Sequence, residues 1–296
     1  MKMSETNSKI HVLFIVGPTA SGKTDYAIRL AKARNGEIVS ADSRYFYRGM
    51  DIGTAKPTIE EREGIPHYLI DVADPDETWS LARFRDAADA AIRDIAGRGK
   101  LPIVVGGTGQ YVRAVLDGWT IPEGETDHRL RAAIESWGEE IGARALYEKL
   151  MCIDAEAAAH IEWQNMRRTV RALEVIFSTG RKFSEQRTVT EPPYDAEVIG
   201  LRRERAALYE RIDARVDKMI DAGFVDEVRE LLAKGYSEEL PSMSAIGYKE
   251  ICAHLRGETT LEEAAQLIKF RTHNYVRRQA NWFKESDPNI RWIEAE

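Results

Sequence analysis

The sequence has little cysteine and no long apolar run, and each absence excludes a class of protein. Its two cysteines, Cys152 and Cys252, belong to no C-x-x-C motif and have no histidine at ligand spacing. We therefore expect neither a disulfide framework nor a zinc site, and a cytoplasmic setting fits. No apolar stretch is long enough to cross a membrane, and residues 1–9 lack the apolar segment of a signal peptide. Internal repeats and low-complexity tracts are also missing.

Composition indicates an ordinary globular chain of 296 residues, with 43% hydrophobic and 31% charged residues. That length accommodates two domains, or one domain with an insertion. The net charge of −7 argues mildly against nucleic acid, but basic residues gather at 167–187 and 269–284. Such patches belong either to an RNA surface or simply to solvated helix faces, and charge alone does not decide between the two.

The clearest motif lies at residues 17–24, which read Gly-Pro-Thr-Ala-Ser-Gly-Lys-Thr. An apolar, strand-like run precedes it and a helical pattern follows, which is the context in which this motif binds a di- or triphosphate. Its glycines let backbone N–H groups turn toward an anion, Lys23 adds a positive charge, and the Thr24 hydroxyl is able to hold magnesium. Kinases, NTPases and transferases all use such a loop. The predicted diphosphate-binding residues are Gly17, Thr19, Ala20, Ser21, Gly22, Lys23 and Thr24.

Alternating strand and helix signals in the first 118 residues predict an α/β fold, a P-loop NTPase-like parallel sheet flanked by helices. The expected strands of the whole chain are 11–16, 37–40, 68–72, 102–105, 197–201 and 290–293. The expected helices around them are 23–33, 81–96, 110–116, 205–222, 225–233 and 261–284.

Residues 121–190 interrupt this alternation because they show helical patterns only. Helices are expected at 129–136, 143–150, 155–161 and 167–177. The sequence therefore predicts a catalytic core formed by 1–120 and 191–296, and an all-helical insertion domain at 121–190.

Ligands of parallel sheets bind beyond the carboxyl ends of the strands, so three motifs are expected to converge there. Besides the phosphate loop, these are Asp42-Ser43 after the second strand and residues 106–109 after the fourth. Asp42 is placed to accept a proton, although a helix cap or a magnesium-water ligand is the plainer alternative. Thr108 lies where backbone approaches a ligand, or it caps an ordinary turn.

Arg211 and Arg215 share one helix face, being four residues apart. An arginine facing a phosphate loop neutralises a leaving diphosphate through a bidentate contact. The spacing alone favours the alternative of an exposed, salt-bridged helix.

Taken together, these segments resemble the tRNA dimethylallyltransferases, also called tRNA isopentenyltransferases, over residues 10–293. The run Met-Asp-Ile-Gly-Thr-Ala-Lys-Pro at 50–57 is the most specific part, because no general logic of phosphate binding explains it. A zinc finger found in eukaryotic members is absent, which indicates a bacterial-type enzyme. The matching segment that contains this run is 47–57, and the others are 17–24, 40–44, 66–67, 106–109, 171–175, 246–248 and 278–283.

The resemblance implies transfer of a dimethylallyl group from dimethylallyl diphosphate to N6 of adenosine 37, in tRNAs reading U-initial codons. Asp42 then resembles the general base for N6, and Thr108 the threonine beside the transferred carbon. Lys23 and Arg215 resemble the cationic clamp on the diphosphate. Mg²⁺ is the implied cofactor, supported by Thr24. Whether ATP also binds the loop stays open.

The same resemblance implies that the insertion holds the tRNA anticodon stem-loop, with adenine 37 splayed out of its stack. A monomer is expected. Four departures from the family pattern concern only the details of RNA contact: Tyr45-Phe46, Gln110, Asp154-Ala155 and Trp163-Gln164-Asn165. The predicted tRNA-binding residues are Asp42, Ser43, Arg44, Tyr45, Thr108, Arg131, Arg167, Gly247, Tyr248, Arg278 and Gln279.

Three alternatives remain. An adenylate isopentenyltransferase shares the core but needs neither the insertion nor the basic C-terminal helix. A small-molecule kinase uses the phosphate loop on ATP but has no use for the 50–57 run. A non-catalytic RNA-binding module has no reason to keep Lys23, Thr24, Asp42 and Thr108 together.

Overall fold

The computed structural model describes residues 9–121, 127–186 and 193–295, which fall into two compact units. The first unit comprises Met1–Leu116 and Pro192–Glu296, and the second comprises Asp117–Glu191. The insertion predicted at 121–190 overlaps the second unit almost entirely, because its loss of strand signals begins where the sheet is interrupted.

Within the described residues the first unit contains a six-stranded sheet in the order β3-β2-β4-β1-β5-β6, and all of its pairings are parallel. The α/β class predicted from the alternating signals is confirmed. Central strands read as continuous apolar runs because helices cover both of their faces. The strands are β1 (Ile10–Val16), β2 (Gly36–Ser40), β3 (His67–Tyr68), β4 (Leu101–Gly106), β5 (Tyr194–Arg202) and β6 (Ile290–Glu294).

Side chains of β1 alternate between two apolar layers. Leu13 and Ile15 join the layer that includes Ile28 of α1 (Lys23–Ala33). Phe14 joins the opposite layer with Phe84 of α2 (Leu81–Gly97), and α3 (Gly109–Leu116) packs on that side too. Two apolar faces on one strand require helices on both sides of the sheet, which fixes the three-layer arrangement.

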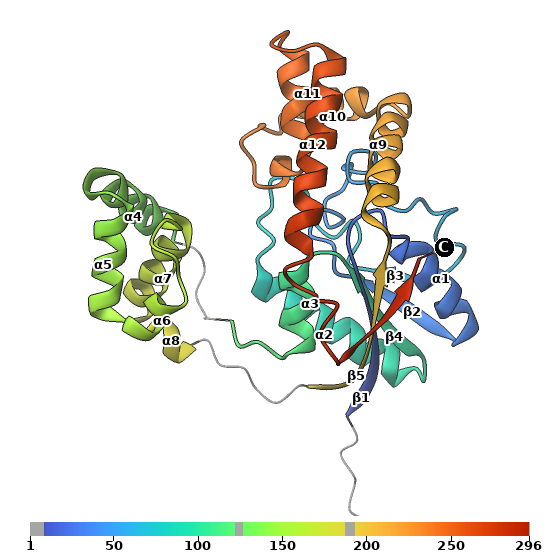
Figure 1. Cartoon of the computed structure of the whole chain (residues 1–296), viewed down its shortest axis with the longest axis horizontal. Coiled ribbons are helices and arrows are strands. Elements are labelled where there is room, and N and C mark those ends of the chain that lie inside the picture. The colour runs from blue at the N-terminus through green and yellow to red at the C-terminus, as the bar shows by residue number, and fades with distance from the viewer. Residues whose placement is uncertain (1–8, 122–126, 187–192, 296) are drawn as a thin grey trace, which may run out of the picture. The chain divides into compact units, whose positions relative to one another are not determined.

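Four helices gather beyond one end of the sheet, coloured from gold to red in Figure 1. α9 packs on α10 and α12, and α11 packs on α10 and α12. A capping box formed by Thr260 and Glu263 starts α12. The last turn of α12 contacts the loops at the strand ends through Gln279. These helices are α9 (Arg205–Asp221), α10 (Phe224–Ala233), α11 (Tyr248–Leu255) and α12 (Leu261–Gln279).

Two sequence predictions were wrong in this unit. The strand expected at 68–72 stops at Tyr68, because Leu69 and Asp71 have φ of 62° and 56°, which is left-handed and not extended. The helix expected at 261–284 ends at Gln279, after which the N–H of Trp282 donates to the Gln279 carbonyl and closes a turn. The short helix α11 was missed, because glycine at its N-cap gives no side-chain signal.

The second unit has its own core, and the elements named in its described residues are helices. Leu146, Leu150 and Leu173 are among its buried side chains. Glu174 is buried as well, and its carboxylate pairs with Arg131 and Arg171 at 2.7 and 3.0 Å. Charges buried in this way need such partners. The helices are α4 (His128–Ile141), α5 (Ala143–Ile153), α6 (Ala155–Ala159), α7 (Met166–Thr179) and α8 (Phe183–Gln186).

Candidate active site

The phosphate loop connects β1 to α1 and is built on unusual backbone angles. Gly17 has φ of 146°, and a Cβ there would lie 2.4 Å from the carbonyl oxygen of Leu201, so no other residue fits. Ala20 and Gly22 are left-handed, with φ of 64° and 90°. Because α1 begins at Lys23, its free N–H groups and positive dipole end lie at the loop.

Two polar side chains of the loop suit an anionic ligand. Burial lowers the pKa of Lys23 to about 8, the nearby charge of Asp42 raises it, and that of Arg215 lowers it. Its Nζ donates to the Pro18 carbonyl at 2.6 Å. The Ser21 hydroxyl is fully buried and has no hydrogen-bond partner among the described residues. An unpaired buried hydroxyl is costly, and a phosphate oxygen in the loop would satisfy it.

Asp42 and Thr108 lie on the neighbouring loops that follow β2 and β4. The ends of these strands are tightly apposed, since a Cβ on Gly106 would lie 2.4 Å from the Ala41 carbonyl oxygen. The N–H of Ser43 points to the Thr108 hydroxyl at 3.5 Å. One Asp42 carboxylate oxygen accepts the N–H of Arg44 at 2.9 Å, which fixes the orientation of the carboxylate. The expected convergence of the strand-end motifs is therefore present.

Gln279, at the end of α12, joins the two halves of the site. Its Oε1 accepts the N–H of Thr19 at 2.9 Å, and its Nε2 donates to the Gly107 carbonyl, also at 2.9 Å. The side chain is buried. The sequence predicts a tRNA-binding role for Gln279, which stays a prediction. In the structure both ends of its amide bridge the phosphate loop and the β4–α3 turn.

Sequence reasoning missed Tyr275, which lies one helical turn before Gln279. Burial raises the pKa of Tyr275, as does the charge of Asp42, while a hydrogen bond to Thr108 lowers it. Tyr275 therefore lies beside both catalytic candidates. Its spacing of four residues from Gln279 on one helix face is the signal that was available.

Arg211 and Arg215 reach loops of the site. Arg211 Nε donates to the Ala20 carbonyl of the phosphate loop at 3.1 Å. Arg215 Nη2 donates to the Thr54 carbonyl at 3.0 Å, and its charge acts on Lys23. The salt-bridged helix that the spacing favoured is thus not what the structure shows for this face of α9.

The described residues contain no cluster of three or more His, Cys, Asp or Glu side chains able to hold a metal. Thr24 lies in the first turn of α1, half-buried beside the loop. A magnesium ion held here by Thr24 would need most of its oxygen ligands from phosphates and water, as is usual for Mg²⁺ with phosphate substrates.

The predicted tRNA-binding residues differ widely in accessibility. Arg278 and Arg167 are exposed, and Arg278 lies over the Tyr275 ring at 6.0 Å. Arg131 forms an ion pair with the buried Glu174. Arg44 instead donates to the Pro241 and Ser242 carbonyls and to the Ser244 hydroxyl.

Three further members of that set lie on the inner side of the site. Tyr248 is fully buried, and its hydroxyl donates to Glu227 at 2.7 Å, so its side chain is not at the surface. Gly247 is the N-cap of α11, with φ of 108°. The Tyr45 hydroxyl donates to the Ala55 carbonyl at 2.9 Å.

The basic stretch at 269–284 is partly neutralised. Lys269 pairs with Asp217 and Arg271 with Glu250, both at 2.6 Å. Arg277, Arg278 and Lys284 are exposed. The paired charges in the middle of α12 fit the interpretation as a solvated helix face. The exposed charges at and after its C-terminal end fit the interpretation as an RNA surface.

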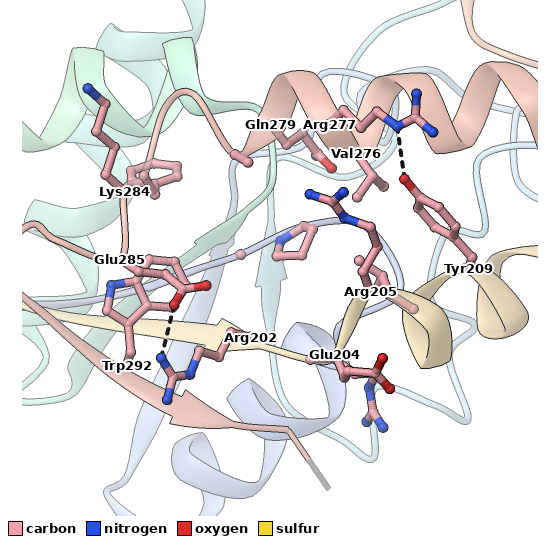
Figure 2. A pocket seen from close by; sticks show the side chains of 16 residues that line it. Arg202, Glu204, Arg205, Tyr209, Val276, Arg277, Gln279, Lys284, Glu285 and Trp292 are labelled. Atoms are coloured by element: carbon pink, nitrogen blue, oxygen red, sulfur yellow. Dashed lines mark hydrogen bonds and ion pairs between the residues drawn. The ribbon is translucent and has the colours of Figure 1, made fainter.

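A pocket of about 540 Å³ opens beside the phosphate loop, between the end of β5, the start of α9 and the end of α12. Figure 2 shows Arg205 and Arg277 on its wall together with Val276 and Trp292. Arg277 Nε donates to the Tyr209 hydroxyl at 2.9 Å. Cationic and apolar groups thus face the same space, next to Gly17 and Pro18 of the loop.

Two protein-family models match the segments that contain these motifs. The model of the IPP transferase family matches residues 45–286, and that of isopentenyl transferase matches residues 10–74. The chain belongs to the IPP transferase family. A tRNA dimethylallyltransferase of Roseiflexus sp. (strain RS-1) is 54% identical over 97% of this chain and 94% of that protein. One of Thermomicrobium roseum is 47% identical over 98% of this chain and 88% of that protein.

Solved structures agree with the assignment of this chain to the IPP transferase family. The tRNA isopentenylpyrophosphate transferase of Bacillus halodurans is 44% identical, with a TM-score of 0.72 over 97% of this chain and 90% of that one. A eukaryotic dimethylallyltransferase acting on tRNA is 30% identical, with a TM-score of 0.83 over 97% and 74%. These neighbours confirm the P-loop NTPase-like fold. No described helix of the IPP transferase has the length and apolarity that crossing a membrane requires.

Proposed function

We propose that this IPP transferase moves a dimethylallyl group from dimethylallyl diphosphate to N6 of adenosine 37, in tRNAs that read U-initial codons. One observation carries the proposal. A general base candidate, Asp42, lies in one site with Thr108 and a cationic phosphate loop. The charges of Asp42 and Arg215 both act on Lys23 of that loop. The tRNA dimethylallyltransferase names of relatives at 54% and 47% identity agree with it.

The chemistry is a displacement at the allylic carbon. A bond forms between N6 and that carbon while the C–O bond to the diphosphate breaks, and one N6 proton leaves. The N6 lone pair is delocalised into the ring, so a carboxylate that takes the proton helps in the transition state. Within the described residues only one oxygen of Asp42 is engaged, by the N–H of Arg44, so the other is available to N6. The proton therefore ends on Asp42.

Charge on the leaving diphosphate grows as the C–O bond breaks, and the loop is arranged to stabilise it. Lys23, Arg215 and the N-terminus of α1 supply positive charge that is fixed before the reaction. Magnesium bound with the diphosphate and Thr24 would add further charge there. The pocket beside the loop suits the approach of the donor, because it combines cationic and apolar walls. We assign the loop to this diphosphate in place of ATP.

Each unit, taken by itself, offers exposed arginines for the proposed contacts with tRNA. Arg167 in the helical unit and Arg278 on α12 are exposed and suited to phosphate contacts. Such contacts fix the register of the anticodon stem-loop, while adenine 37 leaves its stack to reach Asp42. We place the protein in the cytoplasm, acting as a monomer.

A transfer assay tests this proposal. Labelled dimethylallyl diphosphate is incubated with Mg²⁺ and either unmodified tRNA or AMP, with ATP turnover followed in parallel. We expect label in tRNA at adenosine 37, and a loss of at least about a hundredfold in Asp42→Asn, which keeps the shape and removes the base. Asp86→Asn, an exposed change on α2, serves as the control. Label only in AMP would indicate an adenylate isopentenyltransferase, and ATP turnover without transfer would indicate a kinase.

A further inference from the structure

The run at 50–57 is the most specific motif of the sequence, yet phosphate binding does not explain it. In the structure it forms a closed loop, which we call the bracket loop. The Thr54 hydroxyl donates to the Met50 carbonyl at 2.7 Å, and the Lys56 N–H donates to the Asp51 carbonyl at 3.0 Å. The Lys56 ammonium is buried and bonds to Asp51 and Asp71 at 2.5 and 2.6 Å. A loop closed in this way has a fixed shape.

One face of the bracket loop presents three successive N–H groups to a single carboxylate on α10. Glu227 accepts the N–H of Asp51 at 2.9 Å, of Ile52 at 2.6 Å and of Gly53 at 3.1 Å. Glu227 also accepts a hydrogen bond from the Tyr248 hydroxyl at 2.7 Å. Hydrogen bonds to an ionised acceptor are roughly twice as strong as neutral ones, and neighbouring N–H groups form an anion-binding nest. Glu227 is thus a half-buried anion that the N–H groups of the bracket loop bind.

Phe224, one turn before Glu227, packs between α10, the bracket loop and the N-cap of α11. A Cβ added to Gly53 would lie 2.1 Å from its ring, and one added to Gly247 would lie 2.7 Å away. The ring meets the Tyr248 ring edge-on, with centroids 5.1 Å apart. Both glycines are therefore needed for close packing, and Glu227 has little freedom to move relative to the bracket loop.

The other face of the bracket loop presents carbonyl groups to the active site. Thr54 accepts from Arg215 at 3.0 Å, and the next carbonyl, that of Ala55, accepts from the Tyr45 hydroxyl at 2.9 Å. Ala55 has φ of 51°, a left-handed angle that turns its carbonyl relative to that of Thr54. The N–H groups of the loop thus bind Glu227, while its carbonyls orient two side chains of the site.

We infer that Glu227 is a positioning residue for Arg215, acting through the bracket loop. The carboxylate fixes residues 51–53, the fixed loop places the Thr54 carbonyl, and this carbonyl aims the Arg215 guanidinium at the diphosphate. The inference rests on the proposed function, since it assigns Arg215 to the diphosphate clamp. It explains why the 50–57 run, the 246–248 segment and Glu227 occur together: they form one support behind the clamp.

A double-mutant cycle on the full chain tests this inference, with inorganic diphosphate and Mg²⁺ as the probe in titration calorimetry. Glu227→Gln removes the negative charge from the nest and replaces one of the two accepting oxygens by an NH2 group, which cannot accept N–H bonds. We expect it to raise the diphosphate Kd about tenfold in the wild-type background, because a small displacement of a clamp is costly. In the Arg215→Ala background the same change is expected to matter less than about twofold, since coupled residues are not additive. Glu230→Gln, an exposed change on the same helix, is the matched control.

Equal effects of Glu227→Gln in both backgrounds, or no effect in the wild-type background, would overturn the inference. A merely structural role lowers the melting temperature and does not depend on Arg215. If Glu227→Gln does not fold, Tyr248→Phe, which removes one donor to the carboxylate, takes its place in the same cycle with a smaller expected effect. Wild-type protein that binds diphosphate but transfers nothing to tRNA would refute the proposed function and leave this cycle valid.

Discussion

At the residue scale, Lys23 links the charge of the site to pH. Burial lowers the pKa of its ammonium to about 8, while Asp42 opposes the shift. Binding of a diphosphate needs the charged form, and that form is lost as pH rises above the pKa of the free enzyme. An anionic ligand raises the pKa of a buried lysine beside it, so binding between pH 8 and the ordinary lysine value takes up a proton.

We therefore predict that the Kd for inorganic diphosphate is flat below pH 8 and rises by up to about tenfold per pH unit above it. Lys23→Arg, whose guanidinium stays charged, is expected to bind more weakly at pH 7 but without the alkaline rise. Calorimetry in buffers of different ionisation enthalpy would measure the proton uptake directly. A wild-type Kd that stays constant to pH 10 would contradict the lowered pKa.

The residues of the site that could be predicted are those in local motifs. The positions of Lys23, Asp42 and Thr108 follow from loops at strand ends, and the sheet topology brings such loops together. The bridging role of Gln279 and the support by Glu227 were missed, because their partners are far away in the chain: Gln279 bonds Thr19 across 260 residues and Glu227 bonds Ile52 across 175. Local periodicity carries no information on such pairs.

At the scale of elements, the start of α3 depends on a glycine that the chain after α12 covers. A Cβ on Gly109 would lie 2.1 Å from Cγ and 2.4 Å from Cβ of Trp282. These atoms are close to the backbone, so rotation of the ring gives no relief. Trp282 follows Gln279 closely in the chain. A displacement of Trp282 would therefore also disturb the hydrogen bonds by which Gln279 bridges the phosphate loop and the β4–α3 turn.

We predict that Gly109→Ala lowers the free energy of unfolding by about 1–3 kcal/mol, as overpacking typically does, and also lowers transfer to tRNA. The control is Gly97→Ala in the last turn of α2, where a Cβ meets nothing within 4 Å. That change is expected to be neutral, or to stabilise by up to about 1 kcal/mol through helix propensity. Urea unfolding measures both variants, and equal stability of the two would refute the packing argument.

At the scale of the whole molecule, the two units divide the proposed labour. Every residue assigned to the diphosphate lies in the first unit, whereas the second has its own apolar core and its own buried ion pair at Glu174. Separate cores allow the first unit to fold without the second. The sequence predicts an insertion at 121–190 because strand signals vanish over one continuous segment, and the second compact unit spans Asp117–Glu191.

We accordingly predict that replacing residues 117–191 by a Gly/Ser linker leaves the Kd for inorganic diphosphate within about threefold of wild type. Transfer to tRNA is expected to collapse, because the proposed anticodon-arm surface is lost with its phosphate contacts. Filter binding with labelled tRNA, beside calorimetry with diphosphate, separates the two effects. Retained tRNA affinity in the shortened chain would contradict the role proposed for the helical unit.

The strand order has a further consequence while the ribosome is still making the chain. β1 lies between β4 and β5, and β5 begins only at Tyr194, after the helical unit. Until then the nascent sheet has β1 as an open apolar edge, with unpaired N–H and C=O groups that invite pairing with another chain. Long-range parallel pairing is slow and exposed to aggregation. The helical unit thus delays closure of the sheet that it interrupts, and chaperones that bind nascent chains would find β1 exposed throughout that delay.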